Sequence, residues 1–486
     1  MVSTRTSSPS FRSAGAGRSR STAASGGVVT RVPQSATRGI LWPALPSAAG
    51  AQRLSLLYQL DQSQWWPPDQ LRAWQMRQVT ALLAHALRTV PYYSECLHAA
   101  GVRAGEPVTS DVWSRIPLLR RTDIQDAGDT LHSTKLPAQH GPAHSGSTSG
   151  STGRPIVTLG SRITRLLWEV FTLREHLWHR RNFRGKLASI RAFAEGKALY
   201  PKGTALRTWG PAVASVFPTG PAVGLSLLTT AEQQADWLTR QNPDYLLTFP
   251  TAARALARHC QERGITFPRL REVRTVSEVV TPEIRAACRT AWDVPVIDMY
   301  SAREAGYIAL QCPEHEHYHV QSEGVLVEIL DEAGEPCAAG EIGRMVVTVL
   351  HNFAMPLIRY EVGDYAEAGE PCPCGRGLPV IRRILGRTRS MVRLPGGGQM
   401  WPLIAEYRYH EIAPIRQFQI VQKTLDRLEV RLVLERPLTD DEAAQLRGLI
   451  LDRIKHPFEI TFSYHDEIPR GPGGKYEDFT SELRDT

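Results

Sequence analysis

Short apolar runs alternate with longer amphipathic segments between residues 245 and 300, and this alternation limits the possible folds more than any other feature of the sequence. It predicts strands at 245–249, 273–276 and 294–300, and helices at 251–263 and 282–291. Gly264 directly follows the first of these helices and is a suitable terminator. Strands that alternate with helices form βαβ units, so we expect a mainly parallel sheet.

The sequence on either side of this region predicts further elements. An amphipathic helix is expected at 69–87, a β-hairpin or small barrel at 325–350, and strands at 418–421 and 428–434 followed by a helix at 439–455. A segment rich in glycine and charge at 386–398 separates the last group from the rest. We therefore predict an α/β protein with a large N-terminal domain, which holds mainly parallel sheets plus a β-rich subdomain, and a small α+β C-terminal domain.

The net charge of +8 arises at the start of the chain. Seven arginines and no acidic residue occur up to Arg53, and subtracting these seven leaves about +1 for the remainder. We expect residues 1–53 to be a disordered tail rich in Ser, Arg and Ala, followed by domains at 54–386 and 387–486. A transit peptide or an overlong gene start is the alternative for the tail. The nearly neutral remainder lacks the basic footprint of a nucleic-acid-binding domain, so we expect no nucleic-acid partner.

Two further features concern location. No apolar run approaches the ~18 residues that a membrane-spanning helix needs, so we predict no membrane partner. Seven cysteines are an odd number spread through a long chain, which argues for a reducing compartment and a cytoplasmic location.

Four separated segments have residue types that can handle a nucleotide. In the Ser/Thr/Gly-rich loop 148–155, backbone N–H groups and hydroxyls can close around phosphate oxygens. In segment 300–304, the ring of Tyr300 can cover a purine and Glu304 can hold Mg²⁺. Asp364 follows a glycine and suits a ribose diol, and Arg387 can contact the ribose or a phosphate.

A lysine lies in a flexible frame near the end of the chain. Lys475 follows Gly471-Pro472-Gly473-Gly474, and such a loop can bring a cation onto a transition state that carries negative charge. Each of these segments alone also fits an ordinary role as a surface loop, a strand end, a turn or a disordered terminus. Their order and spacing together favour a nucleotide site.

Cysteines and histidines form a separate signal. Cys312 precedes three histidines at 315, 317 and 319, and Cys372 and Cys374 follow about sixty residues later. Thiolate and imidazole are zinc ligands, and three cysteines with one of the histidines complete a tetrahedral site with no open position, which is the structural kind. The alternative is buried thiols beside a solvated His/Glu loop.

Taken together, these segments resemble the adenylate-forming enzymes, and in particular their phenylacetate–CoA ligase-like branch, over about residues 75–480. The residues typical of this branch are found at 82–86, 90–93, 116–120, 277–278, 359–364 and 372–376. The resemblance implies a large N-terminal domain for nucleotide and acid, and a mobile C-terminal domain that carries the lysine. It also implies two half-reactions, in which a carboxylate and ATP give acyl-AMP and pyrophosphate and a second acceptor then displaces AMP.

The resemblance also implies roles for individual residues. The loop Thr148, Ser149, Gly150, Ser151, Thr152 and Gly153 would hold the β- and γ-phosphates. Ser277, Glu278 and Tyr300 would line the adenine, and Asp364 and Arg387 would bind the ribose. Glu304 would hold Mg²⁺, and Lys475 would serve adenylation. Cys312, His319, Cys372 and Cys374 would match a zinc site.

The sequence departs from the family pattern at four positions. Arg154 replaces the usual lysine of the phosphate loop, and Arg389 replaces the usual hinge aspartate. Ser301 stands where phenylacetate ligases have glycine, so its side chain should narrow the acyl pocket. Arg303 stands where a small hydroxyl residue is common and could contact the α-phosphate or the substrate as part of the catalytic set.

These residues predict an ATP-dependent ligase that forms a thioester from an aryl or other hydrophobic carboxylic acid, with coenzyme A or a carrier-protein thiol as acceptor. The cofactors expected are ATP, Mg²⁺ and a structural Zn²⁺, and the resemblance allows a homodimer. The alternatives are an amide-forming ligase or nucleotidyl transferase on the same scaffold, and a zinc-stabilised binding protein that has lost catalysis.

Overall fold

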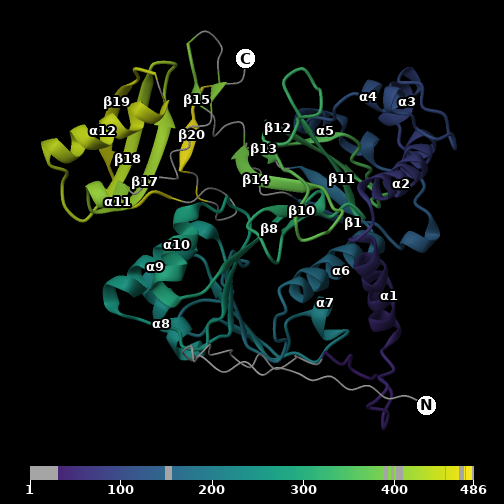
Figure 1. The fold of residues 1–486 in the computed structure, drawn as a ribbon, viewed down its shortest axis with the longest axis horizontal. Coiled ribbons are helices and arrows are strands. Elements are labelled where there is room, and N and C mark those ends of the chain that lie inside the picture. The colour runs from purple at the N-terminus through teal and green to yellow at the C-terminus, as the bar shows by residue number, and fades with distance from the viewer. Residues whose placement is uncertain are drawn as a thin grey trace, which may run out of the picture. The chain divides into compact units, whose positions relative to one another are not determined.

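The fold is described from a computed structural model, which covers residues 31–147, 156–387, 392–395, 399–400, 409–454, 456–469, 476 and 478–483. Its centre is a sheet of twelve strands in the order β11-β12-β13-β14-β10-β9-β8-β7-β6-β3-β5-β4 (Figure 1). One half of this sheet is parallel and the other half is antiparallel, and the two halves meet at β8.

The parallel half contains the region where strands and helices alternate in the sequence. Its strands are β3 (Leu187–Arg191), β5 (Ala222–Ser226), β6 (Tyr245–Thr248), β7 (Glu272–Thr275) and β8 (Val296–Ala302), with β4 (Thr204–Leu206) antiparallel at the edge. Helices α8 (Ala231–Gln241), α9 (Pro250–Arg263) and α10 (Pro282–Trp292) pack against them through a core that includes Trp237, Leu256 and Val273. Helix α9 ends at Gly264, whose φ of +64° suits glycine. The predicted α/β fold is confirmed.

The antiparallel half continues directly from β8. It contains β9 (Gly306–Gln311), β10 (Tyr318–Val320), β11 (Val325–Leu330), β12 (Ile342–Val349), β13 (Tyr360–Ala368) and β14 (Val380–Arg387). Strands β11 and β12 form the predicted hairpin. The β-rich part is therefore joined edge to edge with the parallel strands.

Helices from the first third of the chain cover this sheet. They are α1 (Ala48–Ser63), α2 (Pro68–Thr89), α3 (Tyr93–Ala99), α4 (Ser110–Arg115) and α5 (Arg121–Ala127), followed by α6 (Arg162–Trp178) and α7 (Pro211–Ala214). The hairpin of β1 (His144–Ser147) and β2 (Val157–Gly160) precedes α6. Among the described residues, no helix has the length and apolar character that a membrane span requires.

The expected tail boundary at residue 53 differs from the structure, because α1 begins at Ala48. The side chain of Ser47 caps this helix by accepting a hydrogen bond from the backbone N–H of Gly50 at 3.2 Å. Leu60 of the same helix is buried in a core with α6. Composition alone failed here because the cap and the buried face begin within the Ser/Ala-rich stretch.

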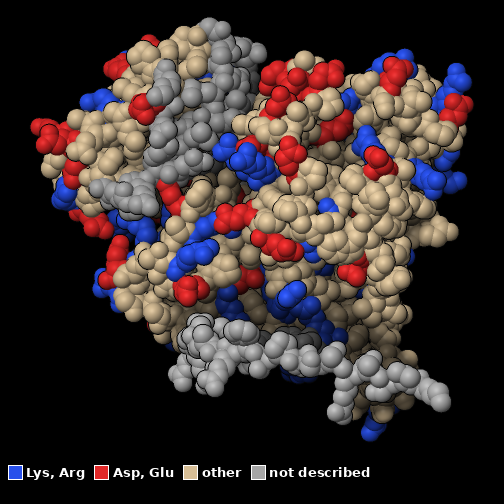
Figure 2. Space-filling view, in the orientation of Figure 1, with Lys and Arg blue, Asp and Glu red and all other residues tan. Residues whose placement is uncertain are grey.

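A separate four-stranded sheet forms near the C-terminus. It contains β17 (Ile415–Gln422), β18 (Arg427–Leu434), β19 (Glu459–Tyr464) and β20 (Phe479–Ser481), and α12 (Asp440–Ile454) packs on it with the short α11 (Tyr409–Ile412). Strands β15 (Val392–Arg393) and β16 (Gln399–Met400) pair with each other. Acidic and basic side chains are interspersed over the visible face of the molecule (Figure 2).

Candidate active site

A cavity of about 1440 Å³ opens at the carboxyl ends of β6, β7 and β8. In open α/β sheets this edge is the usual place for a ligand. The predicted nucleotide-binding residues whose side chains are described meet here. The cavity is lined by Ser277, Glu278, Tyr300, Ser301, Arg303, Glu304 and Asp364. Three chain segments that are distant in sequence therefore line one cavity.

The end of β8 contributes the central residues of this site. The hydroxyl of Tyr300 donates to the carboxylate of Asp364 on β13, with 2.5 Å between the oxygens. The hydroxyl of Tyr360 donates to Glu304 at 3.2 Å. A tyrosine of β8 thus positions the carboxylate on β13, and a tyrosine of β13 positions the carboxylate just after β8. A carboxylate fixed in this way can accept hydrogen bonds or bind a hard cation in a defined direction.

Ser277 and Glu278 follow β7. Ser277 has a φ of +76°, an uncommon conformation for a residue with a side chain. Glu278 accepts hydrogen bonds from the backbone N–H and the hydroxyl of Thr251, at 3.0 and 2.7 Å, and from the backbone N–H of Tyr476 at 2.7 Å. It therefore caps the start of α9, where a negative charge is favourable, and joins this helix to the C-terminal segment.

Asp364 and Arg387 lie opposite each other on the paired strands β13 and β14, as partners in the backbone register. Gly386 has a φ of +97°, and a Cβ atom there would lie 3.4 Å from the side chain of Val279. Strand β14 therefore runs close to the loop after β7, which brings the position of Arg387 to the edge of the cavity. The side chain of Arg387 lies outside the described part of the structure.

In the sequence, the predicted phosphate loop connects β1 to β2. Residues 148–155 and Lys475 lie outside the described residues, as does Arg389. The base of the loop is described, and a Cβ atom on Gly146 would lie 3.7 Å from Nε of Arg303. The side chain of Arg303 thus lies close to the end of β1.

Sequence reasoning missed several polar residues of the cavity, among them His176, Arg274 and Asp298. Asp298 is buried in β8 and accepts hydrogen bonds from Thr275 and Tyr318, both at 2.7 Å. Burial raises the pKa of Asp298 to about 6. The one available signal was an aspartate in the middle of an otherwise apolar strand.

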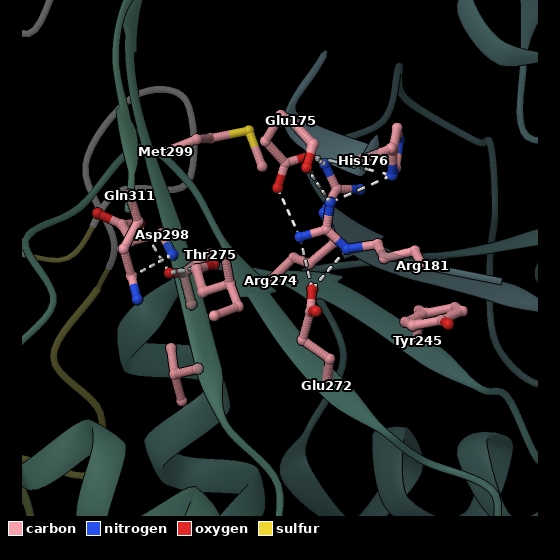
Figure 3. A network of polar contacts seen from close by, with 12 residues as sticks. Glu175, His176, Arg181, Tyr245, Glu272, Arg274, Thr275, Asp298, Met299 and Gln311 are labelled. Carbon is pink, nitrogen blue, oxygen red and sulfur yellow. Dashed lines mark hydrogen bonds and ion pairs between the residues drawn. The ribbon is translucent and has the colours of Figure 1, made fainter. Parts of the chain in front are cut away.

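His176 and Arg274 line the cavity and belong to a buried network of polar contacts (Figure 3). Glu175 on α6 bonds to Arg181 at 2.5 Å and to Arg274 at 2.7 Å, and Arg181 also bonds to Glu272 at 2.7 Å. Burial raises the pKa of Glu175, but Arg181 and Arg274 outweigh this effect and hold it well below the usual range. Burial also raises the pKa of Glu272, which we take as ionised because Arg181 donates to it.

A second cluster lies on the antiparallel half. Single ligand atoms of Cys312, His317, His319 and Cys372 lie within 4.8 Å of one another. The set named from sequence had Cys374 in place of His317. The structure puts Cys374 Sγ 3.4 Å from Nε2 of His319, and His317 Nε2 3.0 Å from Sγ of Cys372. His317 thus joins the group because alternate residues of an extended segment share a face.

The donors of this cluster fit a zinc ion. Two thiols and two imidazoles are a common ligand set for a tetrahedral site. Nδ1 of His319 is buried and has no hydrogen-bond partner among the described residues. Burial lowers the pKa of His319 to about 3, with the charge of Arg376 adding to the effect, so the ring is neutral and has a lone pair for a metal.

Comparison with known proteins agrees with this arrangement. The chain is 27% identical to the phenylacetate-coenzyme A ligase of Thermus thermophilus, over 84% of this chain and 96% of that protein. It is 22% identical to the phenylacetate-coenzyme A ligase of Escherichia coli, over 83% and 93%. The chain is thus similar over most of its length to phenylacetate-coenzyme A ligases, as the resemblance in its motifs predicts.

Other matches agree with this adenylate-forming fold. A structure of 2-hydroxyisobutyryl-CoA ligase in complex with R3-HIB-AMP superimposes with a TM-score of 0.68 at 16% identity, covering 87% of this chain and 92% of that one. The model of the CapK C-terminal domain matches residues 405–481. That range includes the four-stranded C-terminal sheet.

Proposed function

We propose that this protein activates a carboxylic acid with ATP and transfers the acyl group to the thiol of coenzyme A. The observation that carries the proposal is the gathering of Ser277, Tyr300, Arg303, Glu304 and Asp364 around one cavity at the carboxyl end of the sheet. The relatives named as phenylacetate-coenzyme A ligases, which align over most of the chain, support the same activity.

In the first half-reaction, a carboxylate oxygen of the acid attacks the α-phosphorus of ATP, and the bond to the β-phosphate breaks to release pyrophosphate. In the second, the thiol sulfur attacks the acyl carbon, its proton passes to solvent, and AMP leaves. Neither step needs much acid–base work by side chains, so the protein contributes mainly positioning and charge stabilisation.

We propose individual roles from the family resemblance, and the positions of Tyr300, Glu304 and Asp364 in the cavity lining support them. The ring of Tyr300 covers the adenine beside Ser277 and Glu278, and Asp364, held by Tyr300, binds the ribose together with Arg387. Glu304 holds Mg²⁺, which neutralises phosphate charge when bound. Arg303, whose Nε lies close to Gly146 at the end of β1, would contact a phosphate, and Lys475 would assist adenylation.

The first test is ATP–pyrophosphate exchange with a panel of aryl, arylacetic and fatty acids. We expect acid-dependent exchange, which falls by about 10²-fold or more in Asp364→Ala and Lys475→Ala because each removes a group that binds the nucleotide or stabilises transition-state charge. Lys423→Ala, whose partly exposed side chain is not part of the cavity lining, is the control that should retain exchange. Absence of exchange with every acid would contradict the proposal. In a separate experiment, coenzyme A, a carrier protein or an amine is added to the activated acid, and the product formed identifies the acceptor.

We further propose that Cys312, His317, His319 and Cys372 hold a structural zinc ion, with Cys374 next to it. Four protein ligands leave no open position, so the ion would pin β10 to the loop between β13 and β14 rather than take part in chemistry. The free form of all seven cysteines fits a reducing compartment, and we place the protein in the cytoplasm.

Zinc content provides a direct measurement. Elemental analysis of the purified protein should give about one zinc per chain, and Cys372→Ser should lose it because a thiolate ligand is removed. Cys337→Ser, which lies outside the cluster, is the matched control and should keep the metal. A wild-type protein that neither contains nor binds zinc would contradict the assignment.

A further inference from the structure

The cavity extends beyond the proposed nucleotide-binding residues to a region beneath α6. Its walls there are mostly apolar or aromatic, and they include Trp168, Leu187, Trp209, Leu247 and Tyr307. The rings of Trp168 and Tyr307 lie with centroids 4.5 Å apart. On the proposed function, this is where the body of the acid substrate binds, because the nucleotide occupies the end near Tyr300 and Asp364.

One polar side chain in this wall has a defined hydrogen-bonding state. His176 lines the cavity although only 3% of the residue is exposed. Its Nδ1 lies 3.3 Å from a guanidinium nitrogen of Arg181 (Figure 3). A guanidinium group can only donate, so Nδ1 must accept and cannot carry a hydrogen. In the neutral ring the hydrogen is therefore on Nε2.

The surroundings keep this ring neutral. Burial lowers the pKa of His176 well below its usual value, and the nearby charge of Arg274 lowers it further. The network beside it contains two carboxylates, Glu175 and Glu272, and two guanidinium groups, so its charges cancel. The cavity thus receives a neutral N–H group from His176 rather than a cation.

Nε2 of His176 has no hydrogen-bond partner among the described residues. Other polar groups of this wall are already occupied, since the hydroxyls of Thr172 and Ser189 donate to backbone carbonyls at 2.8 and 3.3 Å. The hydroxyl of Thr248, which also lines the cavity and is 1% exposed, has no partner among the described residues either. Buried donors without partners are costly, and a ligand can satisfy them.

We propose that the acid activated by this protein carries a neutral hydrogen-bond acceptor, such as an ether, carbonyl or hydroxyl oxygen, at the end far from its carboxylate. The Nε2–H group of His176 binds that acceptor and makes His176 a specificity-determining residue. A plain hydrocarbon tail would leave this donor buried without a partner, and the site therefore discriminates against it.

Matched acids test this assignment through ATP–pyrophosphate exchange. The panel contains 4-methoxy, 4-ethyl and 4-carboxy derivatives of benzoic, phenylacetic and phenylpropionic acids, so that shape stays similar while the distal group changes. We expect the methoxy acid to have a kcat/KM about tenfold or more above that of the ethyl acid in at least one series. Only the methoxy oxygen can accept the hydrogen bond from Nε2–H of His176. His176→Phe keeps a ring but removes the N–H, and should abolish this preference while it retains exchange with the ethyl acid.

The outcomes separate this inference from the proposed function. Equal exchange with methoxy and ethyl acids in every series, or a preference for the carboxy acid, would overturn the inference and leave the ligase activity intact. Exchange with no acid would overturn both. His98→Phe, an exposed histidine on α3, is the control that should keep the wild-type preference.

A second measurement does not depend on enzymatic activity. The ¹⁵N spectrum of histidine-labelled wild-type protein should show the His176 ring as the neutral Nε2–H form throughout pH 6–8, with its signal assigned by its absence in His176→Phe. A ring that is protonated on Nδ1 in this range would overturn the inference.

Discussion

Glu175 shows how strongly a single buried charge depends on its partners. Its side chain is 0% exposed and bonds to both Arg181 and Arg274. Losing one member of such a network leaves an uncompensated charge in a region without water, which costs far more than the loss of a surface pair. Because partners lower the pKa of Glu175 in the folded state, its stabilising contribution is present above the ordinary carboxyl pKa and is lost as the pH falls.

We therefore expect Glu175→Gln to lower the free energy of unfolding by about 3–5 kcal/mol at pH 7, measured by urea denaturation. The matched control is Asp236→Asn, which removes the exposed partner of Arg240 on α8 and should leave stability almost unchanged. Similar losses in the two variants would show that the buried network contributes no more than a surface pair.

Strand β8 is the element in which the parallel half of the sheet becomes antiparallel. Its inner half is apolar except for Asp298, which bonds to Thr275 on β7 and Tyr318 on β10. Burial raises the pKa of Asp298 to about 6, so between about pH 4 and pH 6 the folded protein holds a proton that the unfolded chain has released. The folded state therefore loses stability as the pH rises through this window.

Asp298→Asn should remove this dependence. From pH 4 to pH 6.5 the wild type should lose up to about 3 kcal/mol of unfolding free energy that the variant does not lose. This is the size expected for a pKa shift of about two pH units. Urea denaturation at a series of pH values measures this difference. Parallel profiles of the two proteins would contradict the titration of Asp298 in this range.

The sequence predicted those parts of the molecule that depend on neighbours along the chain. Helix α9 with its stop at Gly264 and the β11–β12 hairpin were predicted closely, because hydrophobic period and turn residues are local signals. The motif residues of the cavity were found through their resemblance to a family. His176 and Arg274 were not, since their importance depends on contacts between α6 and β7 that no local pattern shows. His317 was not chosen over Cys374 because ligand geometry depends on the folded loops.

The order of strands in the central sheet has a consequence for how the chain is made. Strand β10 pairs with β14, yet β11, β12 and β13 are synthesised between them. Until Val380 leaves the ribosome, the edge of β10 has no strand to pair with in the final arrangement. An unpaired edge is a template for contact with other chains. The nascent protein is thus most exposed to misassociation during the roughly sixty residues that separate these two strands.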